Sequence, residues 1–507
     1  MLAVDGHRLT LDDVVRVARE NEKVRLAPAA AKRVDASRHA LERLVKGSTV
    51  AYGIKTGFGE LANVSIPDED VRQLQINLLR SHAVGQGTPL PTDAVRAALL
   101  LRANTLAMGH SGVRRGLIEL LLEMLNRGVH PVVPSRGSLG ASGDLAPLAH
   151  LGLVLVAEGE AEVAGEVLPG KEALAKADLE PVTLDTKEGL ALINGTAVMT
   201  GVGALALADA LALLKDAQVA ASLSFEALRG SPQPYDDRLV ALKPQAGARE
   251  VARNLRRLLR GSEIVPSHPG THRVQDAYTL RCIPQVLGAV RSTLDYAAEV
   301  VRVEMNAATD NPLIFPEDGV SVSGGNFHGM AAAMALDHAA LAMAVLAGFT
   351  ERRIARLVDT RLSELPAFLT RKGGLNSGMM ILQYVAADYA SQNKVLAHPA
   401  SADSIPTSAN QEDYVPMGMA AALKARDAVD NAAHVVALEY LAAAQGLEFL
   451  KPLRAGLGPR AAAARIRREI PPLEEDRPMS REVGRVLTWM RSGELVGAVE
   501  KAAGPLD

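Results

Sequence analysis

A loop rich in glycine and serine, Gly137 to Asp144, has the residue types and spacing that most directly suggest chemistry. Two common functions do not fit it. A phosphate-binding loop needs a glycine followed by Lys and Ser or Thr, and a nucleophile elbow needs a glycine two places after its serine. Asp144 occupies the decisive position in both cases. A flexible turn is the plain structural alternative.

The triplet Ala141-Ser142-Gly143 suggests a third kind of chemistry. The amide nitrogen of Gly143 has no side chain shielding it, so it could attack the Ala141 carbonyl if the backbone bends tightly. Loss of water would close a five-membered ring, and loss of the Ser142 hydroxyl would leave an exocyclic methylene. The product would be an electrophile made from the chain itself. Three small residues alone leave this chemistry and the flexible turn as alternatives.

The composition indicates the elements that must position such a loop. The chain has 507 residues, of which 48% are hydrophobic but only 3% aromatic, and Ala and Leu recur in long stretches. Both are strong helix formers, so we expect a mainly α, close-packed protein. The 55 basic and 58 acidic residues nearly cancel, which weighs against nucleic-acid binding. The single cysteine, Cys282, excludes an internal disulfide and favours a cytoplasmic location.

Hydrophobic periodicity predicts helices in both halves of the chain. We expect them in 92–127 with a break near 109–112, in 148–156, in 286–305 ending at Asp310-Asn311-Pro312, in 336–357 and in 419–444. A small hairpin is expected in 159–167. The most apolar stretches contain charges, which argues against a membrane span; these are Asp209, Lys215, Asp216, Asp337 and His338. We divide the chain near residue 200, into an N-terminal domain (1–200) and a long-helix bundle (201–507).

Seven segments, in order, resemble the aromatic amino-acid ammonia-lyases. They are 52–59 (YGIKTGFG), 140–150 (GASGDLAPLAH), 194–196 (NGT), 275–281 (QDAYTLR), 310–312 (DNP), 324–328 (GGNFH) and 410–413 (NQED). The resemblance implies that Ala141, Ser142 and Gly143 form 4-methylideneimidazol-5-one (MIO) autocatalytically, with no external cofactor. It also implies an elongated helical bundle of the ammonia-lyase/fumarase-aspartase-like type, with a smaller mixed N-terminal part that carries the electrophile loop.

The resemblance also implies roles for individual residues. Tyr52 is the candidate base for the β-proton, and Tyr278 would assist proton handling near the amine. Arg281 suits a bidentate grip on a carboxylate. The remaining candidates surround the electrophile, the carboxylate or the substrate ring, and they are Asn194, Gln275 and Phe327.

The substrate is indicated by fewer residues. In the family, a Ser-His pair at Ser81-His82 goes with histidine, which would be converted to trans-urocanate and ammonia in histidine degradation. An imidazole needs polar partners, whereas a phenyl ring needs an apolar wall. Glu412 is the second polar candidate, and Met380 could line the pocket or simply pack in the core. Lys55 and Tyr414 depart from the commonest family pattern.

Three alternatives remain. A phenylalanine or tyrosine ammonia-lyase, or an aminomutase, is disfavoured by Ser81-His82. An enzyme of the fumarase and aspartase type would show a different serine loop. A non-catalytic scaffold would be expected to have lost Ser142, Tyr52 or Arg281, and all three are present. The family further implies a homotetramer with shared active sites. We expect an amino-acid substrate and no metal site, nucleic-acid partner or membrane.

Overall fold

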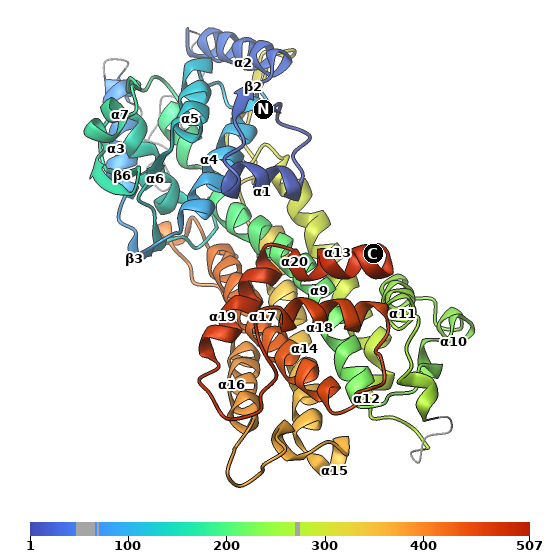
Figure 1. Cartoon of the computed structure of the whole chain (residues 1–507). Coiled ribbons are helices and arrows are strands. Elements are labelled where there is room, and N and C mark those ends of the chain that lie inside the picture. The colour runs from blue at the N-terminus through green and yellow to red at the C-terminus, as the bar shows by residue number, and fades with distance from the viewer. Residues whose placement is uncertain (47–65, 68–69, 269–273) are drawn as a thin grey trace. The chain divides into compact units, whose positions relative to one another are not determined.

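The computed structural model describes residues 1–46, 66–67, 70–268 and 274–507, and its chain is mostly helical (Figure 1). The prediction of a mainly α protein is therefore confirmed. Tyr52 and Lys55 lie outside the described residues. Two compact units alternate along the chain: unit 1 contains 1–208, 297–337 and 399–426, and unit 2 contains 209–296, 338–398 and 427–507. The division into domains 1–200 and 201–507 stays a prediction.

Unit 1 combines helices with all the strands of the described residues. Its strands are β1 (Leu2–Val4), β2 (Val24–Leu26), β3 (Gln86–Pro89), β4 (Val129–Pro131), β5 (Pro134–Arg136), β6 (Glu160–Val163), β7 (Glu166–Pro169), β8 (Leu313–Phe315) and β9 (Val320–Val322). Its helices are α1 (Leu11–Arg19), α2 (Pro28–Lys46), α3 (Val71–His82), α4 (Thr92–Ala107), α5 (Arg115–Arg127), α6 (Leu145–Leu155), α7 (Gly170–Lys176) and α8 (Glu188–Ile193).

The sheets of unit 1 are small. β1 pairs with β2 in parallel, and the other pairs, β3 with β5, β4 with β6, β6 with β7 and β8 with β9, are antiparallel. Such short ribbons cannot form a core of their own, so they border the helices. β5 leads directly into the loop that precedes α6.

Three helices of unit 1, α3, α6 and α8, pack on one another. Glycines permit the close approach: a Cβ at Gly152 of α6 would lie 3.1 Å from Leu79 of α3, and one at Gly189 of α8 would lie 2.6 Å from the Gln75 carbonyl oxygen. His82 ends α3, Asp144 precedes α6, and Asn194 follows α8. The packing of these three helices therefore sets the relative positions of three sequence motifs.

Four long helices contribute to both units, and they are α9 (Ala197–Ala227), α13 (Ile283–Met305), α14 (Met330–Val358) and α17 (Gly418–Glu448). Unit 2 also contains α10 (Asp237–Ala241), α11 (Ala246–Leu258), α12 (Tyr278–Arg281), α15 (Thr360–Ser363), α16 (Met380–Leu396), α18 (Leu457–Arg467), α19 (Ser480–Arg491) and α20 (Glu494–Ala503). Short 3₁₀ turns occur at Gln233–Tyr235, Val265–Ser267 and Ala367–Leu369 in unit 2 and at Ser408–Asn410 in unit 1.

Most expected elements are confirmed. α4 and α5 flank the predicted break near 109–112, β6 and β7 form the predicted hairpin, and α14 and α17 include the ranges expected to be helical. One boundary was wrong: α13 ends at Met305, before Asp310-Asn311-Pro312. The side-chain amide of Asn306 donates from Nδ2 to the Leu9 carbonyl, and its Oδ1 accepts from the Leu9 N–H. Asn306 therefore binds the backbone of a distant segment just after the helix ends.

Two helices, α9 and α14, are long and apolar enough to cross a membrane by composition alone. However, 78% of the apolar window of α9 and 61% of that of α14 is buried inside the protein. A helix that is apolar on all sides is typical of a protein core. We therefore interpret both as core helices.

A buried ion pair joins three helices of unit 2. Arg353 of α14 donates from Nε and Nη2 to the two carboxylate oxygens of Glu439 of α17, at 2.6 and 2.8 Å. Ser224 of α9 donates to the same carboxylate at 2.6 Å. Both charged side chains are fully buried, and a bidentate pair offsets the cost of removing them from water only when its geometry is good.

Asp216 of α9 gives the first testable prediction. Burial raises the pKa of this carboxyl to about 8, although Tyr440 donates a hydrogen bond to it. The folded state thus binds more protons than the unfolded chain between about pH 4 and about pH 8, and the free energy of unfolding falls as pH rises through that window. Asp216→Asn keeps an acceptor for Tyr440 without a charge. We expect its melting temperature to exceed that of the wild type increasingly as pH rises.

The measurement is thermal unfolding of both proteins from about pH 5 to about pH 9. Asp388→Asn, at an exposed position of α16, is the matched control and should follow the wild type. Parallel curves for Asp216→Asn and wild type would contradict the assignment of a neutral Asp216.

Candidate active site

The loop before α6 makes its closest backbone contact with the segment that follows α8. Gly143 has a positive φ of 79°, and its backbone forms a bridge with Gly195. A Cβ at Gly143 would lie 2.2 Å from the Gly195 carbonyl oxygen, a distance that side chains do not tolerate. Only glycine permits this approach of two backbones.

The Ser142 carbonyl oxygen receives two hydrogen bonds in this arrangement. Asn194 Nδ2 donates to it at 2.8 Å, and the Gly195 N–H donates at 3.3 Å. The Asp144 N–H donates in turn to the Gly195 carbonyl at 2.7 Å. Two fixed donors on one oxygen can stabilise negative charge that develops there during a reaction.

Asp144 anchors the loop from behind. Its buried carboxylate accepts hydrogen bonds from Ser138 Oγ at 2.8 Å and from the N–H groups of Val198 and Met199 at 2.9 and 2.8 Å. Those N–H groups belong to the first turn of α9, where a helix favours a negative charge. Burial raises the pKa of Asp144 to about 6, while these hydrogen bonds oppose the rise. The carboxylate thus connects the loop 137–144 to α9.

Glu412 reaches the same loop from a distant part of the sequence. The Ser142 hydroxyl donates to Glu412 Oε1 at 2.5 Å, and Thr407 Oγ1 donates to the other oxygen at 3.0 Å. The carboxylate is therefore fixed beside the Ser142 side chain.

His82 lies at the end of α3 in the same unit. Its Nδ1 lies 2.8 Å from the Leu78 carbonyl, which can only accept, so this nitrogen carries the proton and Nε2 is left as an acceptor. Burial lowers the pKa of His82, while the Leu78 hydrogen bond and the charge of Glu412 partly oppose the shift. The imidazole is consequently neutral near pH 7, and Ser81 Oγ lies 3.0 Å from Nδ1.

Phe327 is half-buried and lies two residues before Gly329, which contacts the loop. The Gly329 N–H donates to the Gly140 carbonyl at 3.0 Å, which holds the segment that carries Phe327 against the loop. Unit 1 thus brings together most of the predicted site residues that it contains. These are Ala141, Ser142, Gly143, Asn194, His82 and Glu412, with Phe327 on an adjoining segment.

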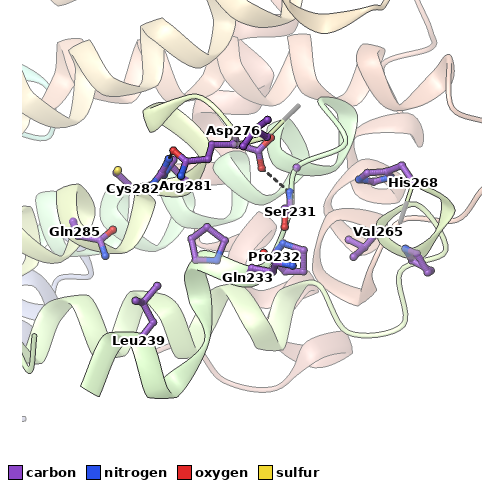
Figure 2. A pocket seen from close by; sticks show the side chains of 15 residues that line it. Ser231, Pro232, Gln233, Leu239, Val265, His268, Asp276, Arg281, Cys282 and Gln285 are labelled. Carbon is purple, nitrogen blue, oxygen red and sulfur yellow. Dashed lines mark hydrogen bonds between the residues drawn. The ribbon is translucent and has the colours of Figure 1, made fainter. Parts of the chain in front are cut away.

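Unit 2 holds a second group of predicted residues (Figure 2). Arg281 and Gln275 line a cavity of about 810 Å³, together with Asp276, Cys282 and Gln285. Arg281 donates to the Gln275 side-chain oxygen. Asp276 accepts from the Ser231 N–H at 2.6 Å, which fixes the neighbouring loop. The cavity has a cation and an amide that can bind an anionic group.

Tyr278 and Met380 are less directly placed. Tyr278 begins α12, is largely exposed, and lies under the Arg281 guanidinium, whose carbon is 5.6 Å from the ring centroid. Met380 begins α16, is half-buried and is not among the residues that line the cavity. Tyr52 lies outside the described residues. Within the described ranges, no group of three or more His, Cys, Asp or Glu residues could hold a metal ion.

Three residues of this region had no role predicted from the sequence. Asp144 served only to exclude two other kinds of loop, and Glu304, which accepts from Thr196 Oγ1 at 2.6 Å, was not considered. Arg102 was also missed, although a charge within the otherwise apolar stretch 97–103 was a usable signal. Charges at such positions need partners that only the folded chain reveals.

The close contact of the two glycines yields the second prediction. Gly143→Ala should lower the melting temperature strongly, because its Cβ would separate the loop from Gly195 and break the Asp144 to Gly195 hydrogen bond. Gly165→Ala is the matched control: Gly165 also has a positive φ, 82°, but open space around its Cβ. The free energy of unfolding of this control should fall by only about 1 kcal/mol, which is the cost of placing alanine at a positive φ. Equal melting temperatures for the two variants would contradict the steric argument.

Comparison with known proteins identifies the family. The aromatic amino acid lyase profile matches residues 9–468. Histidine ammonia-lyase of Symbiobacterium thermophilum is 53% identical over 502 residues, which cover 99% of each chain. The crystal structure of histidine ammonia-lyase from Trypanosoma cruzi matches with a TM-score of 0.93 and 40% identity, over 99% of this chain and 96% of that one. Tyrosine aminomutase from Streptomyces globisporus matches with a TM-score of 0.95 and 36% identity over the whole of both chains. Profile, sequence identity and fold agree: the chain belongs to the aromatic amino acid lyase family.

Proposed function

We propose that this chain eliminates ammonia from L-histidine and releases trans-urocanate, a step of histidine degradation. Its family makes it a carbon–nitrogen lyase. The observation that carries the proposal is the position of Ser142, whose carbonyl is held by Asn194 and Gly195 and whose hydroxyl is held by Glu412. The histidine ammonia-lyases among its relatives support the choice of substrate.

The proposed electrophile is MIO, formed by cyclisation of Ala141, Ser142 and Gly143 with loss of two water molecules. The residues present fit this group, because the loop has left-handed backbone at Gly140 and Gly143 and no space for a side chain at Gly143. Its carbonyl oxygen would be that of Ser142, which already has two donors. The group would supply an electron-poor methylene that assists departure of the amine.

Proton transfer is assigned to two tyrosines. Tyr52 is the proposed base for the β-proton, and Tyr278 is proposed to handle a proton near the amine. A free tyrosine titrates near 10, so the surroundings of Tyr52 should favour its phenolate. Positioned proton transfer of this kind is needed because the β-proton of an amino acid is only weakly acidic.

Binding of the substrate carboxylate is assigned to Arg281 and Gln275. Arg281 offers paired N–H donors in a plane that matches a carboxylate, and it donates to the side-chain oxygen of Gln275. Phe327 is proposed to pack beside the electrophile and substrate. Met380 remains a proposed pocket residue with core packing as its alternative.

Recognition of the imidazole is assigned to His82 and Glu412. Neutral His82 has an acceptor at Nε2, and Glu412 is an acceptor fixed beside Ser142. A substrate imidazole carries an N–H that needs such an acceptor, whereas a phenyl ring would leave both groups unpaired. This polarity favours histidine over phenylalanine.

We further propose a cytoplasmic homotetramer whose active sites combine several subunits. Exposed apolar side chains support an association surface, and on α14 and α16 they are Leu341, Val345, Ile381, Tyr384, Val385 and Val395. Apolar surface of this kind is typically covered by a partner.

The test of the activity is incubation of the protein with L-histidine, L-tyrosine and L-phenylalanine separately. We expect an ultraviolet-absorbing conjugated product and ammonia from histidine, and no β-amino acid. Ser142→Ala should abolish turnover, because alanine cannot supply the methylene. Cinnamate from phenylalanine without urocanate from histidine, or a β-amino acid, would contradict the substrate or the reaction. Full turnover by Ser142→Ala would show that the reaction does not need MIO formed from Ser142.

The role of His82 gives a separate prediction. His82→Leu should lower kcat/KM for histidine by roughly 10–100-fold, because one buried polar contact to the substrate is lost. His39→Leu, at an exposed position of α2, is the control and should leave kcat/KM unchanged. Steady-state rates at saturating and limiting histidine check both. Wild-type kcat/KM for His82→Leu would remove His82 from the substrate site.

A further inference from the structure

Arg102 is a buried cation behind the candidate electrophile loop. It lies in α4, in which every residue from Ala94 to Ala107 is buried, and its own side chain is fully buried. Burial lowers the pKa of Arg102 to about 10, and the carboxylates of Asp310 and Asp144 oppose the shift. The guanidinium therefore remains charged at neutral pH, and burying a charge at this depth costs free energy unless the charge is paired and hydrogen-bonded.

The only hydrogen bond of Arg102 within the described residues goes to the segment that holds Ser142. Nη1 donates to the Asn194 carbonyl oxygen at 2.8 Å, while Nε and Nη2 have no partner there. A Cβ at Gly195 would lie 2.5 Å from Nη1, so the guanidinium packs directly against the Asn194–Gly195 peptide. Unpaired buried donors are uncommon and call for an explanation.

The same peptide connects Arg102 to the Ser142 carbonyl. Its carbonyl accepts from Arg102, and its N–H, that of Gly195, donates to Ser142. A cation that donates to a peptide carbonyl polarises the peptide and strengthens its N–H as a donor. A chain of two hydrogen bonds thus runs from a buried positive charge to the oxygen that is proposed to become part of MIO.

Buried charges also fix α8, the short helix that Asn194 follows. At the beginning of α8, Lys187 Nζ donates to Asp310 Oδ2 at 2.7 Å, and both side chains are fully buried. Arg114 pairs there with Glu188, which is fully buried. Arg102 holds the other end of this short helix. The carbonyl of Asn194 therefore has little freedom to move away from Arg102.

We propose that Arg102 is a positioning residue of the active site, which fixes and polarises the Asn194–Gly195 peptide so that it binds the Ser142 carbonyl oxygen. The inference rests on the proposed function. It predicts two effects of removing the guanidinium. MIO formation becomes slower or incomplete, because the loop is less firmly held, and turnover by the protein that has formed MIO falls, because Gly195 becomes a weaker donor.

The experiment compares Arg102→Met and Arg102→Lys with Arg96→Met and Arg96→Lys. Arg96 is a matched control, because it lies on the same helix, is also buried, and donates to the backbone carbonyls of Val17, Ala18 and Leu125 instead. MIO formation is read from the mass of the proteolytic peptide containing residues 141–143, which is lighter by two water molecules when the ring has formed. The melting temperature, kcat and KM are measured on the same preparations.

Arg102→Met should leave part of the peptide uncyclised and lower kcat per cyclised site by roughly 10–100-fold, with KM for histidine nearly unchanged. Arg102→Lys keeps the charge but not the planar guanidinium, so it should lower kcat by roughly 3–10-fold. The Arg96 variants should lose melting temperature while retaining complete cyclisation and wild-type kcat.

Complete cyclisation and wild-type kcat in Arg102→Lys, or equal losses of kcat in the Arg96 and Arg102 variants at equal melting temperature, would overturn the role of Arg102. The Lys variant decides the question if the Met variant does not fold. A wild-type protein that itself lacks the lighter peptide would contradict the proposed function, and the inference would fall with it.

Discussion

The contact between the backbones of Gly143 and Gly195 is the constraint on which the candidate site depends. Because neither segment has a Cβ at this point, the chains approach closely enough for the Ser142 carbonyl to reach both the Asn194 side chain and the Gly195 N–H. The packing of α3, α6 and α8 sustains this approach, since these helices bear the segments concerned. Dense helix packing and a tight backbone contact thus have the same origin in small residues.

Buried charges stiffen the region at a cost in stability. Arg102 and Lys187 are positive, Asp144 and Asp310 are negative, and all four are buried. Each would be strongly destabilising alone, whereas together they balance in charge and bind the main chain around the loop. Local departures from an apolar core are expected where function requires a fixed geometry. The unit 2 pair of Arg353 and Glu439 shows the different case of a bidentate pair that links helices.

Local features of the sequence predicted local features of the structure. Helix periodicity and the glycines of the loop were sufficient for α4, α5 and the site of the tight turn, because these depend on neighbouring residues. The hydrogen bond between Ser142 and Glu412 joins residues 270 positions apart, and no spacing rule predicts it. The family resemblance supplied Glu412 as a candidate, but the role of Arg102 required the folded chain. The end of α13 at Met305 also depends on residues far apart in the sequence, because the Asn306 side chain binds the backbone of Leu9.

The two groups of candidate residues complement each other chemically. Unit 1 contains the acceptors Glu412 and neutral His82 near the loop 137–144, while unit 2 contains the cation Arg281 with Gln275. An amino acid needs a cation for its carboxylate, and an imidazole N–H needs an acceptor, so neither group alone satisfies histidine. Each group therefore matches a different part of the proposed substrate: Arg281 and Gln275 match the carboxylate, and Glu412 and His82 match the imidazole.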